Sequence, residues 1–183
     1  MPLYIPRRAY REQSNYQTSA MGSTPGTSVP THATVNSTKG TATELIASAN
    51  FDVMEIEVYI TNYGLSATSA KGMVDILIGA SLGTVLIANL MSGNAGGSSV
   101  LGEGGKSWRF PIYIPAGTRI GAQAAGERTG VSLRVGITLY EKPAGALATK
   151  VVTYGVGTVP DGVAVTASNG GEGSWTQITA STR

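Results

Sequence analysis

Apolar residues alternate with polar ones along three stretches of the chain. Between residues 54 and 60, aliphatic side chains fall on one face of an extended chain, and Glu55 and Glu57 fall on the other. Residues 108–114 and 132–139 alternate in the same way. A period of two is typical of a half-buried antiparallel strand. Each stretch therefore predicts one strand that supplies a face to a common core.

Further strands are predicted where Val, Ile, Thr and Tyr dominate between clusters of Gly, Asn and Ser. No stretch of a dozen residues shows a helical stripe with caps. About eight strands of this length predict an all-β fold, a jelly-roll-like antiparallel β-sandwich with an extended N-terminal arm. The further strands are 72–79, 84–90, 119–124 and 150–154, and the loops are 62–72, 92–105 and 126–130.

Residues 1–41 differ in composition from the rest of the chain, because Ser, Thr, Gly and Pro dominate from Thr18 to Thr41. Such a segment cannot bury enough apolar area to offset its ordering entropy, so we expect an arm that is ordered only on a partner. Its tyrosines and arginines could stack on bases, but they are also favoured anchors at protein interfaces, which we prefer, together with strand addition to a neighbouring sheet. The candidate partner-binding residues are Tyr4, Arg7, Arg8, Tyr10, Arg11 and Tyr16.

Two segments of the chain resemble each other in sequence. The segment Gly40–Ala49 reappears at Gly173–Thr182, and the order Val-Pro precedes both copies at residues 29–30 and 159–160. So long a period favours domain duplication, although small polar residues also align by chance in such a chain. We expect a β-sandwich over 42–148, and a linker with the start of a second, repeat-like β segment over 149–183. That last segment either begins a second sandwich or donates a strand to a neighbour.

The composition narrows the functional classes. Charged residues make up 13% of the chain, about half the usual share, which suits a protein packed against copies or partners. A net charge of +2 is too small to indicate nucleic-acid binding. Cysteine is absent, so disulfides and thiolate metal sites are excluded. No apolar run has the length of a signal peptide or a membrane span, and we expect a soluble protein without cofactor, made in the cytosol.

The candidate catalytic residues are few. His32 is the only histidine and lies in the expected arm, which argues against a nucleophile–histidine pair. The acids Asp52, Glu55 and Glu57 could form a glycosidase pair, but the solvent face of a strand explains their spacing. Lys106 follows glycines without the Walker arrangement. We therefore predict no enzymatic activity.

The sequence predicts the surroundings of two charged residues, Asp75 and Arg119. Asp75 interrupts an apolar run, and if buried it would need a cationic or N–H partner, with Arg119 or Arg134 as the nearest candidates. Strand alternation instead favours an Asp75 that points outward or lies between subunits. Arg119 is expected to pair with a carboxylate of a neighbouring strand. It follows Pro115 and Gly117, which predict a turn with positive φ at the glycine.

Three segments together resemble the small β-sandwich virion structural proteins of tailed bacteriophages. They are Glu44–Ser48 with the strand after it, Val74–Ala80 and Ile112–Ile120, and the resemblance covers roughly residues 36–140. It implies a non-enzymatic virion protein of the head-decoration, fibre-anchoring or tail type, anchored by its arm. Its partners would be other virion proteins and copies of itself as a homo-oligomer, and it would assemble in the host cytoplasm.

Two alternative functions share this architecture. A carbohydrate- or receptor-binding module of a tail or fibre would present aromatic residues at one end of the sandwich, and the candidates are Trp108, Trp175 and Tyr63. A polysaccharide-degrading enzyme would require two acids at glycosidase distance in a groove.

Overall fold

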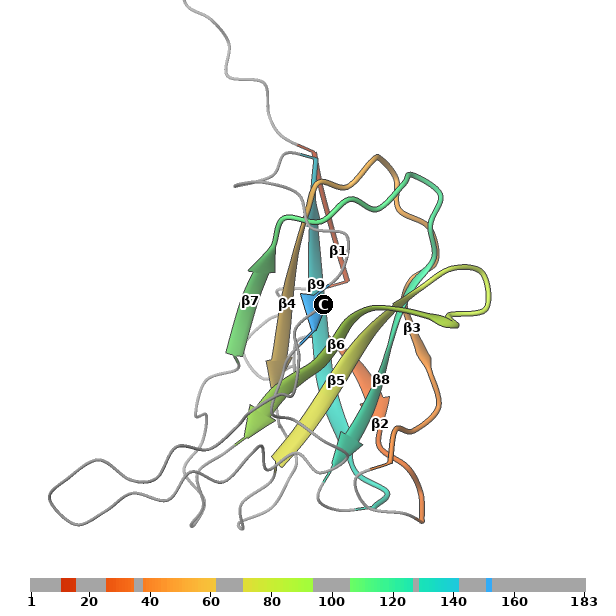
Figure 1. Cartoon of the computed structure of the whole chain (residues 1–183), viewed down its shortest axis with the longest axis vertical. Coiled ribbons are helices and arrows are strands. Elements are labelled where there is room, and N and C mark those ends of the chain that lie inside the picture. Colours follow the sequence, from red (N-terminus) through yellow and green to blue (C-terminus); the bar gives the residue numbers. More distant parts are fainter. Residues whose placement is uncertain are drawn as a thin grey trace, which may run out of the picture.

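The computed structural model describes residues 11–15, 26–34, 38–61, 71–93, 106–126, 129–141 and 151–152. These residues form two antiparallel β-sheets and no helix (Figure 1). Sheet A contains β1 (Glu12–Ser14), β2 (Thr27–Pro30), β4 (Glu55–Thr61), β7 (Lys106–Phe110) and β9 (Ser132–Tyr140). Sheet B contains β3 (Thr43–Ile46), β5 (Lys71–Ile78), β6 (Thr84–Gly93), β8 (Ile120–Gly126) and β10 (Val151–Val152). Only β10, beside β6, is parallel to its neighbour among these strands. The all-β prediction is confirmed.

The antiparallel pairs are nested around the turn between β5 and β6. Moving outward along the chain, β5 pairs with β6, β4 with β7, β3 with β8 and β2 with β9. Successive pairs alternate between sheet B and sheet A. The pairs β4–β9 and β5–β8 then join them into the orders β2-β9-β4-β7 and β3-β8-β5-β6. Strands β2 to β9 thus form four nested antiparallel pairs that resemble one long two-stranded ribbon folded over on itself.

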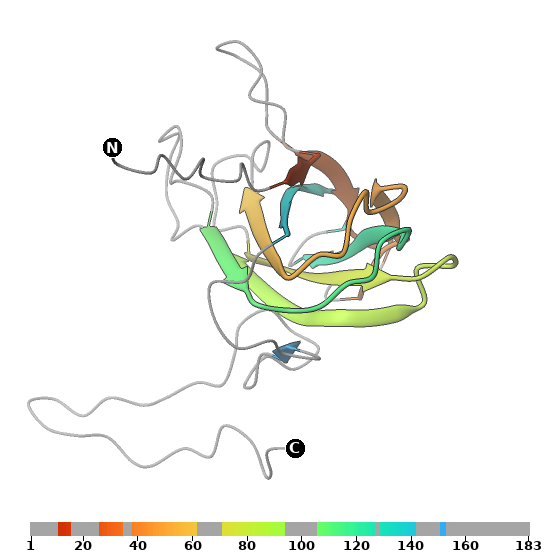
Figure 2. The ribbon, with the colours of Figure 1, turned by 90° about the horizontal axis from the view of Figure 1, so that it is seen from above.

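The two sheets share one hydrophobic core. In Figure 2, β4 and β9 of sheet A lie on one side and β5 and β6 of sheet B lie on the other. The predicted alternation holds along β4 and β9, where every second side chain is buried, as Val58 and Ile137 show. Sheet B contributes Ile76 and Ile120 to the same cluster. Each such side chain stabilises the fold by about 1.5–3 kcal/mol.

The strand predicted over 108–114 ends early. β7 stops at Phe110 because Pro111 has no N–H to donate to a ladder. Ile112 and Ile114 are still fully buried. Ile114 exchanges two backbone hydrogen bonds with Val53, at N···O distances of 2.8 and 3.0 Å. The apolar pattern therefore predicted the strand correctly as far as Phe110, and its continuation to Ile114 was wrong although Ile112 and Ile114 are buried.

The turn predicted at Pro115 and Gly117 is confirmed. Gly117 has a φ of +81°, and the N–H of Thr118 donates to the Pro115 carbonyl over 3.2 Å. The N–H of Gly117 also donates to the Ala49 carbonyl, and the N–H of Ala49 donates to the Thr118 carbonyl. These bonds hold the entry to β8 against the segment after β3.

Parts of the expected arm belong to the sheet. β1 and β2 both pair with β9, and Val29 is fully buried in the core. The expectation that the chain stays outside the fold up to Thr41 is therefore wrong for these two strands. Residues 1–10, 16–25, 142–150 and 153–183 lie outside the described residues, so the division into arm, sandwich and second β segment stays a prediction.

Other strand boundaries shift by a few residues. β6 continues past the predicted end at Leu90 to Gly93, and β8 continues to Gly126. The ladder between β5 and β6 changes register opposite Asp75, where Asn89 has a φ of +57°. This bulge turns the Asn89 N–H toward the Asp75 side chain on β5, to which it donates a hydrogen bond.

Candidate functional site

The outer face of sheet A carries a network of four polar side chains that we call the sheet A network: Glu55, Glu57, Arg109 and Tyr140. Strand register places them together. Glu57 on β4 lies opposite Arg109 on β7, and Glu55 lies opposite Tyr140 on β9. The inward residues between them fill the core, so the period of two leaves these polar groups on one outer surface.

Glu57 is the centre of the sheet A network. Its Oε2 accepts from Arg109 Nε at 3.1 Å and from Arg109 Nη2 at 2.9 Å. The Tyr140 hydroxyl donates to the same oxygen at 2.9 Å and accepts from Arg109 Nη2 at 3.1 Å. The guanidinium also lies over the Tyr140 ring, 5.0 Å from its centroid. One arginine thus holds a carboxylate and an aromatic ring in fixed positions.

The surroundings of Tyr140 and Arg109 in this network raise the pKa of both side chains. Burial and the hydrogen bond to Glu57 raise the pKa of the Tyr140 hydroxyl to about 12. The hydrogen bond to Glu57 raises the pKa of the Arg109 guanidinium. Tyr140 therefore stays a neutral donor and Arg109 stays cationic at ordinary pH. Arg109 Nε and Nη2 and the Tyr140 hydroxyl are engaged with Glu57 and with each other, so the network is closed upon itself through these groups.

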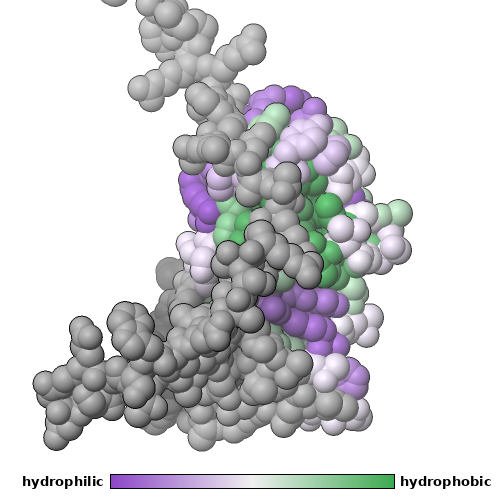
Figure 3. All heavy atoms as spheres, viewed as in Figure 1, coloured by the Kyte–Doolittle hydropathy of each residue, from purple (hydrophilic) through white to green (hydrophobic). Residues whose placement is uncertain are grey.

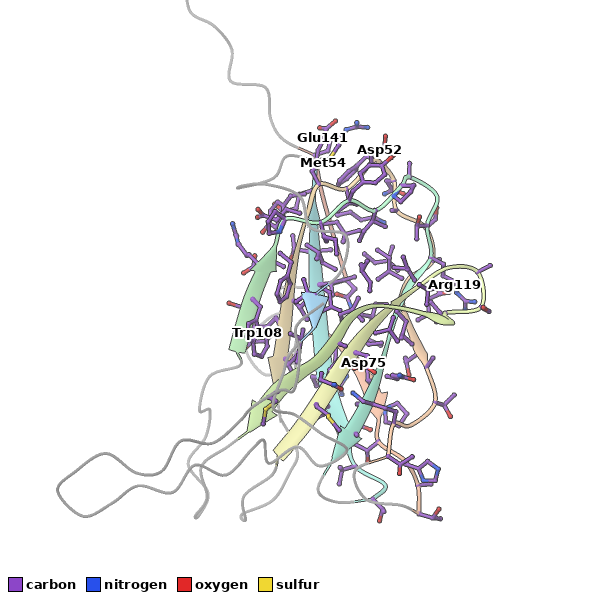
Figure 4. All side chains as sticks on the ribbon, viewed as in Figure 1. Asp52, Met54, Asp75, Trp108, Arg119 and Glu141 are labelled. Carbon is purple, nitrogen blue, oxygen red and sulfur yellow. The ribbon has the colours of Figure 1, made fainter. Side chains whose placement is uncertain are left out.

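The three acids weighed as a glycosidase pair have different environments. Glu55 is 3% exposed, and its carboxylate lies 3.6 Å from Arg109 Nη1. Asp52 lies at the end of the molecule where β4 starts, near Met54 and Glu141 (Figure 4), and it accepts from the Ala116 N–H. The expectation of a simple solvated face is wrong for Glu55. The guanidinium of Arg109 lies beside this buried carboxylate.

The Trp108 side chain does not lie on the outer face of sheet A. It lies on β7 next to Arg109, and alternation turns it inward, where it is half-buried and packs against the core (Figure 4). Of the aromatic residues proposed for ligand stacking, it is therefore only partly exposed. Tyr63 and Trp175 lie outside the described residues. Tyr59 and Tyr140 occupy the outer face instead, and both are half-buried.

Sheet B carries a second polar cluster around Asp75. Asp75 Oδ1 accepts from Lys39 Nζ at 2.8 Å and from the Asn89 N–H at 2.7 Å, and Oδ2 accepts from Gln123 Nε2 at 2.8 Å. Asp75 alternates with the core residues and is 6% exposed. The expected exposure is therefore wrong, and the cation beside it is Lys39 rather than Arg119 or Arg134. Burial lowers the pKa of the Lys39 ammonium, against the effect of its hydrogen bond to Asp75.

The outer face of sheet B is apolar around this cluster. Met73 and Leu77 flank Asp75 on β5, and both are 2% exposed although neither belongs to the shared core. Figure 3 shows hydrophobic residues in the upper part of the described surface and a block of hydrophilic residues below them. Met73 and Leu77 are buried and add almost nothing to the free surface.

The two arginines proposed for ion pairs lie apart from Asp75. Arg119 Nε donates to Glu44 on the neighbouring strand β3, and Arg119 Nη1 donates to the Ala80 carbonyl at 2.8 Å. Both side chains of this ion pair are about two-fifths exposed, at 41% and 40%. Arg134 Nη1 reaches the Gly26 carbonyl at 3.5 Å. Neither arginine belongs to either polar cluster.

Of the candidate arm residues, only Arg11 is among those described. Its guanidinium pairs with Glu141 and lies over the Phe51 ring, 5.3 Å from the centroid. These contacts are within its own chain, at the end where β9 finishes. The other candidates lie outside the described residues: Tyr4, Arg7, Arg8, Tyr10 and Tyr16.

Sequence reasoning missed two central residues, Arg109 and Lys39. The position of Arg109 was present in the pattern, because it alternates with Trp108 and so had to face outward with Glu55 and Glu57. Lys39 gave no such signal, since it lies ahead of β3 and outside any periodic run.

Among the described residues, no group of three His, Asp or Glu side chains is arranged to hold a metal ion. Within the same part of the chain, no helix is long and apolar enough to cross a membrane. Comparison with known proteins finds no matching family model, no matching curated protein and no matching solved structure. The geometry of the two sheets and their polar clusters is therefore the basis for assigning a function.

Proposed function

We propose that the two sheets form a jelly roll and that the chain is a non-enzymatic structural protein of a tailed-phage virion. The observation that carries this proposal is the nested pairing of β2 through β9. Eight strands wound into two facing sheets define a jelly roll, which is frequent in viral capsid and lectin domains. The phage-like segments lie within these strands and their turns, which adds support from the sequence.

The low content of charged residues supports an assembled state. Surfaces between subunits are depleted in charge relative to free surfaces. The chain is 13% charged, about half the usual share. We propose that copies of the chain and other virion proteins are its partners, and that the virion is its location.

The particle role can be tested by labelling. An antibody raised against the chain, applied to purified phage particles in negative stain, should mark one defined position on each particle. The same antibody preabsorbed with the protein is the control. Signal that stays in the soluble lysate and never co-purifies with particles would contradict the proposal.

The N-terminal arginines and tyrosines are proposed as the anchor. Their chemistry is seen at Arg11, which pairs with a carboxylate and stacks on an aromatic ring in the same molecule. We expect the double variant Arg7→Ala, Arg8→Ala to weaken the attachment of the chain to the virion at least about tenfold. Truncating an anchor arginine costs about 2 kcal/mol or more of binding free energy. The double lysine variant is the matched control. Equal attachment of the alanine variant and the natural chain would refute this role.

A carbohydrate- or receptor-binding role is the second candidate, and the sheet A network favours it. Jelly rolls also serve as lectins, and Arg109 with Tyr140 offers a charged group and a ring held together. On a glycan array we expect saturable binding that Arg109→Ala removes and Arg119→Ala retains, since Arg119 lies outside the network. Absence of saturable binding by the natural chain would exclude this function.

A further inference from the structure

The ion pair between Lys39 and Asp75 is enclosed on the outer side of sheet B. The Asp75 side chain is 8% exposed and the Lys39 side chain is 20% exposed, and Asp75 lies in the middle of β5 (Figure 4). Its strand neighbours on the same face, Met73 and Leu77, are both 2% exposed. Removing two opposite charges from water is costly, whereas an amide between the same side chains carries no charge. Burial therefore favours a neutral product over the charged pair.

The Lys39 amine is held close to the carboxyl carbon of Asp75. Nζ lies 2.8 Å from Oδ1. Because Oδ1 is bonded to Cγ at about 1.2 Å, Nζ lies within about 4 Å of Cγ, against about 3–3.5 Å in a near-attack geometry. The N–H of Gly40 donates to the Ala124 carbonyl at 2.8 Å, so the backbone next to Lys39 is fastened to β8. The fold thus keeps an amine and a carboxyl group together at a high effective concentration.

The burial of Lys39 also favours its reactive form. Burial lowers the pKa of the Lys39 ammonium, although the hydrogen bond to Asp75 acts in the opposite direction. A lower pKa raises the share of neutral amine, and a lysine amine acts as a nucleophile in that form. Lys39 therefore resembles the desolvated lysines that form covalent bonds in proteins more than a solvated surface lysine.

Two further donors hold the carboxyl group of Asp75. The Asn89 N–H donates to Oδ1 at 2.7 Å, and Gln123 Nε2 donates to Oδ2 at 2.8 Å. Asn89 has a φ of +57°, which is uncommon for a residue other than glycine. Donors that are fixed on a carbonyl oxygen stabilise the negative charge that develops there during acyl transfer. The bulge at Asn89 thus places an N–H where a tetrahedral intermediate needs one.

We propose that the side chains of Lys39 and Asp75 join in an intramolecular isopeptide bond, which ties the segment ahead of β3 to β5. The ammonium first passes one proton to the carboxylate. Nζ then attacks Cγ, the Nζ–Cγ bond forms and the Cγ–Oδ2 bond breaks. Oδ2 leaves as water with two protons that came from Nζ, and Oδ1 remains as the amide oxygen. The chain has no cysteine, so this bond takes the place that a disulfide has in other small β-proteins.

The intact mass of the full natural chain, measured after denaturation, tests the proposal. We expect a mass below that of the sequence by one water, about 18 Da. Lys39→Arg keeps a cation beside Asp75 but removes the amine, so this variant should have its full mass. Lys106→Arg, on β7 of the other sheet, is the matched control and should keep the loss. A natural chain of full mass, or a loss that persists in Lys39→Arg, would overturn the proposal.

Peptide mapping locates the bond, because a cyclic imide formed at an aspartate also loses one water. Trypsin should leave the chain uncut after Lys39, since an acylated lysine has no charge for the protease to recognise. The digest should contain one branched product that joins the peptide with Lys39 to the peptide with Asp75. A lost water with these two peptides recovered separately would show an imide instead and would refute the isopeptide bond.

Discussion

The Lys39 ammonium lies 2.8 Å from the Asp75 carboxylate, although Lys39 precedes β3 and Asp75 sits in the middle of β5. The pair fastens the segment ahead of β3 onto the outer face of sheet B. Gln123 and the Asn89 N–H complete the set of donors around the same carboxylate. An otherwise costly buried charge is thereby neutralised and hydrogen-bonded.

Replacing Asp75 with alanine should destabilise the fold by about 3–5 kcal/mol, because Lys39 and two N–H donors lose their acceptor in a buried place. Chemical denaturation of the variant measures this loss. The matched control is Glu44→Ala, which breaks the exposed pair with Arg119 and should cost less than about 1 kcal/mol. Similar losses in both variants would mean that the Asp75 cluster is no more than a surface ion pair.

Val29→Ala tests whether β2 is an intrinsic part of sheet A. Val29 is fully buried, so truncation should cost about 2 kcal/mol through lost apolar contact and a residual cavity. Ser28→Ala, on the exposed neighbour, should be within about 0.5 kcal/mol of the natural chain. Urea titration of both full-length variants and the natural chain at equal concentration compares them. A neutral Val29→Ala variant would restore the interpretation of this segment as an arm outside the fold.

Gly26 and Gly117 both have positive φ but should respond differently to alanine. At Gly117 nothing lies within 4 Å of an added Cβ, so Gly117→Ala carries only backbone strain of about 1–2 kcal/mol. At Gly26 the Cβ would lie 2.7 Å from the backbone of Val135, and the clash adds to the strain. We expect Gly26→Ala to lower the midpoint of thermal unfolding clearly more than Gly117→Ala does. The reverse order would contradict the close packing of β2 on β9.

The raised pKa of Tyr140 predicts a loss of stability at high pH. The hydroxyl titrates at a pKa of about 12 in the folded chain, against an ordinary value of 10.0. Between these values the unfolded chain has released the proton and the folded chain keeps it, so stability falls as the pH rises. The contribution is complete below pH 10 and is lost as the pH passes 12.

Tyr140→Phe isolates this effect, because phenylalanine does not titrate. The stability difference between the natural chain and the variant should be constant below pH 9 and should shrink as the pH rises above 10. Tyrosinate absorbance should also lose its highest step in the variant. A difference that is flat up to pH 12 would show that burial and the hydrogen bond to Glu57 do not raise the pKa of Tyr140 in the folded chain.

The strands with one buried face were predictable, and the segments fixed by distant neighbours were not. Along β4 and β9 the alternation was complete, so Val58 and Ile137 could be assigned to the core from the sequence. β2 has a single buried aliphatic residue, and its stability comes from backbone pairing with β9. Composition measures local apolar content and carries no information about a partner roughly 100 residues away.

Only part of the candidate site could be predicted from the alternation of apolar and polar residues. Arg109 follows from alternation with Trp108, which fixes its face. The partner of Asp75 does not follow, because Lys39 reaches it from outside any strand and the bulge at Asn89 is needed to turn an N–H toward it. A single sequence shows which residues share a strand face but not which loop crosses over it.

The concentric arrangement of strand pairs sets an order of assembly for the folding chain. The hairpin of β5 and β6 closes across a short turn, and each later pair then joins ends that the previous pair has already brought near one another. Pairing of β2 and then β1 with β9 comes last, and the β1–β9 pair spans the greatest separation along the chain. We therefore expect slow folding in which β5 and β6 pair first and the outer strand pairs form later. On unfolding, the outermost strands should detach first.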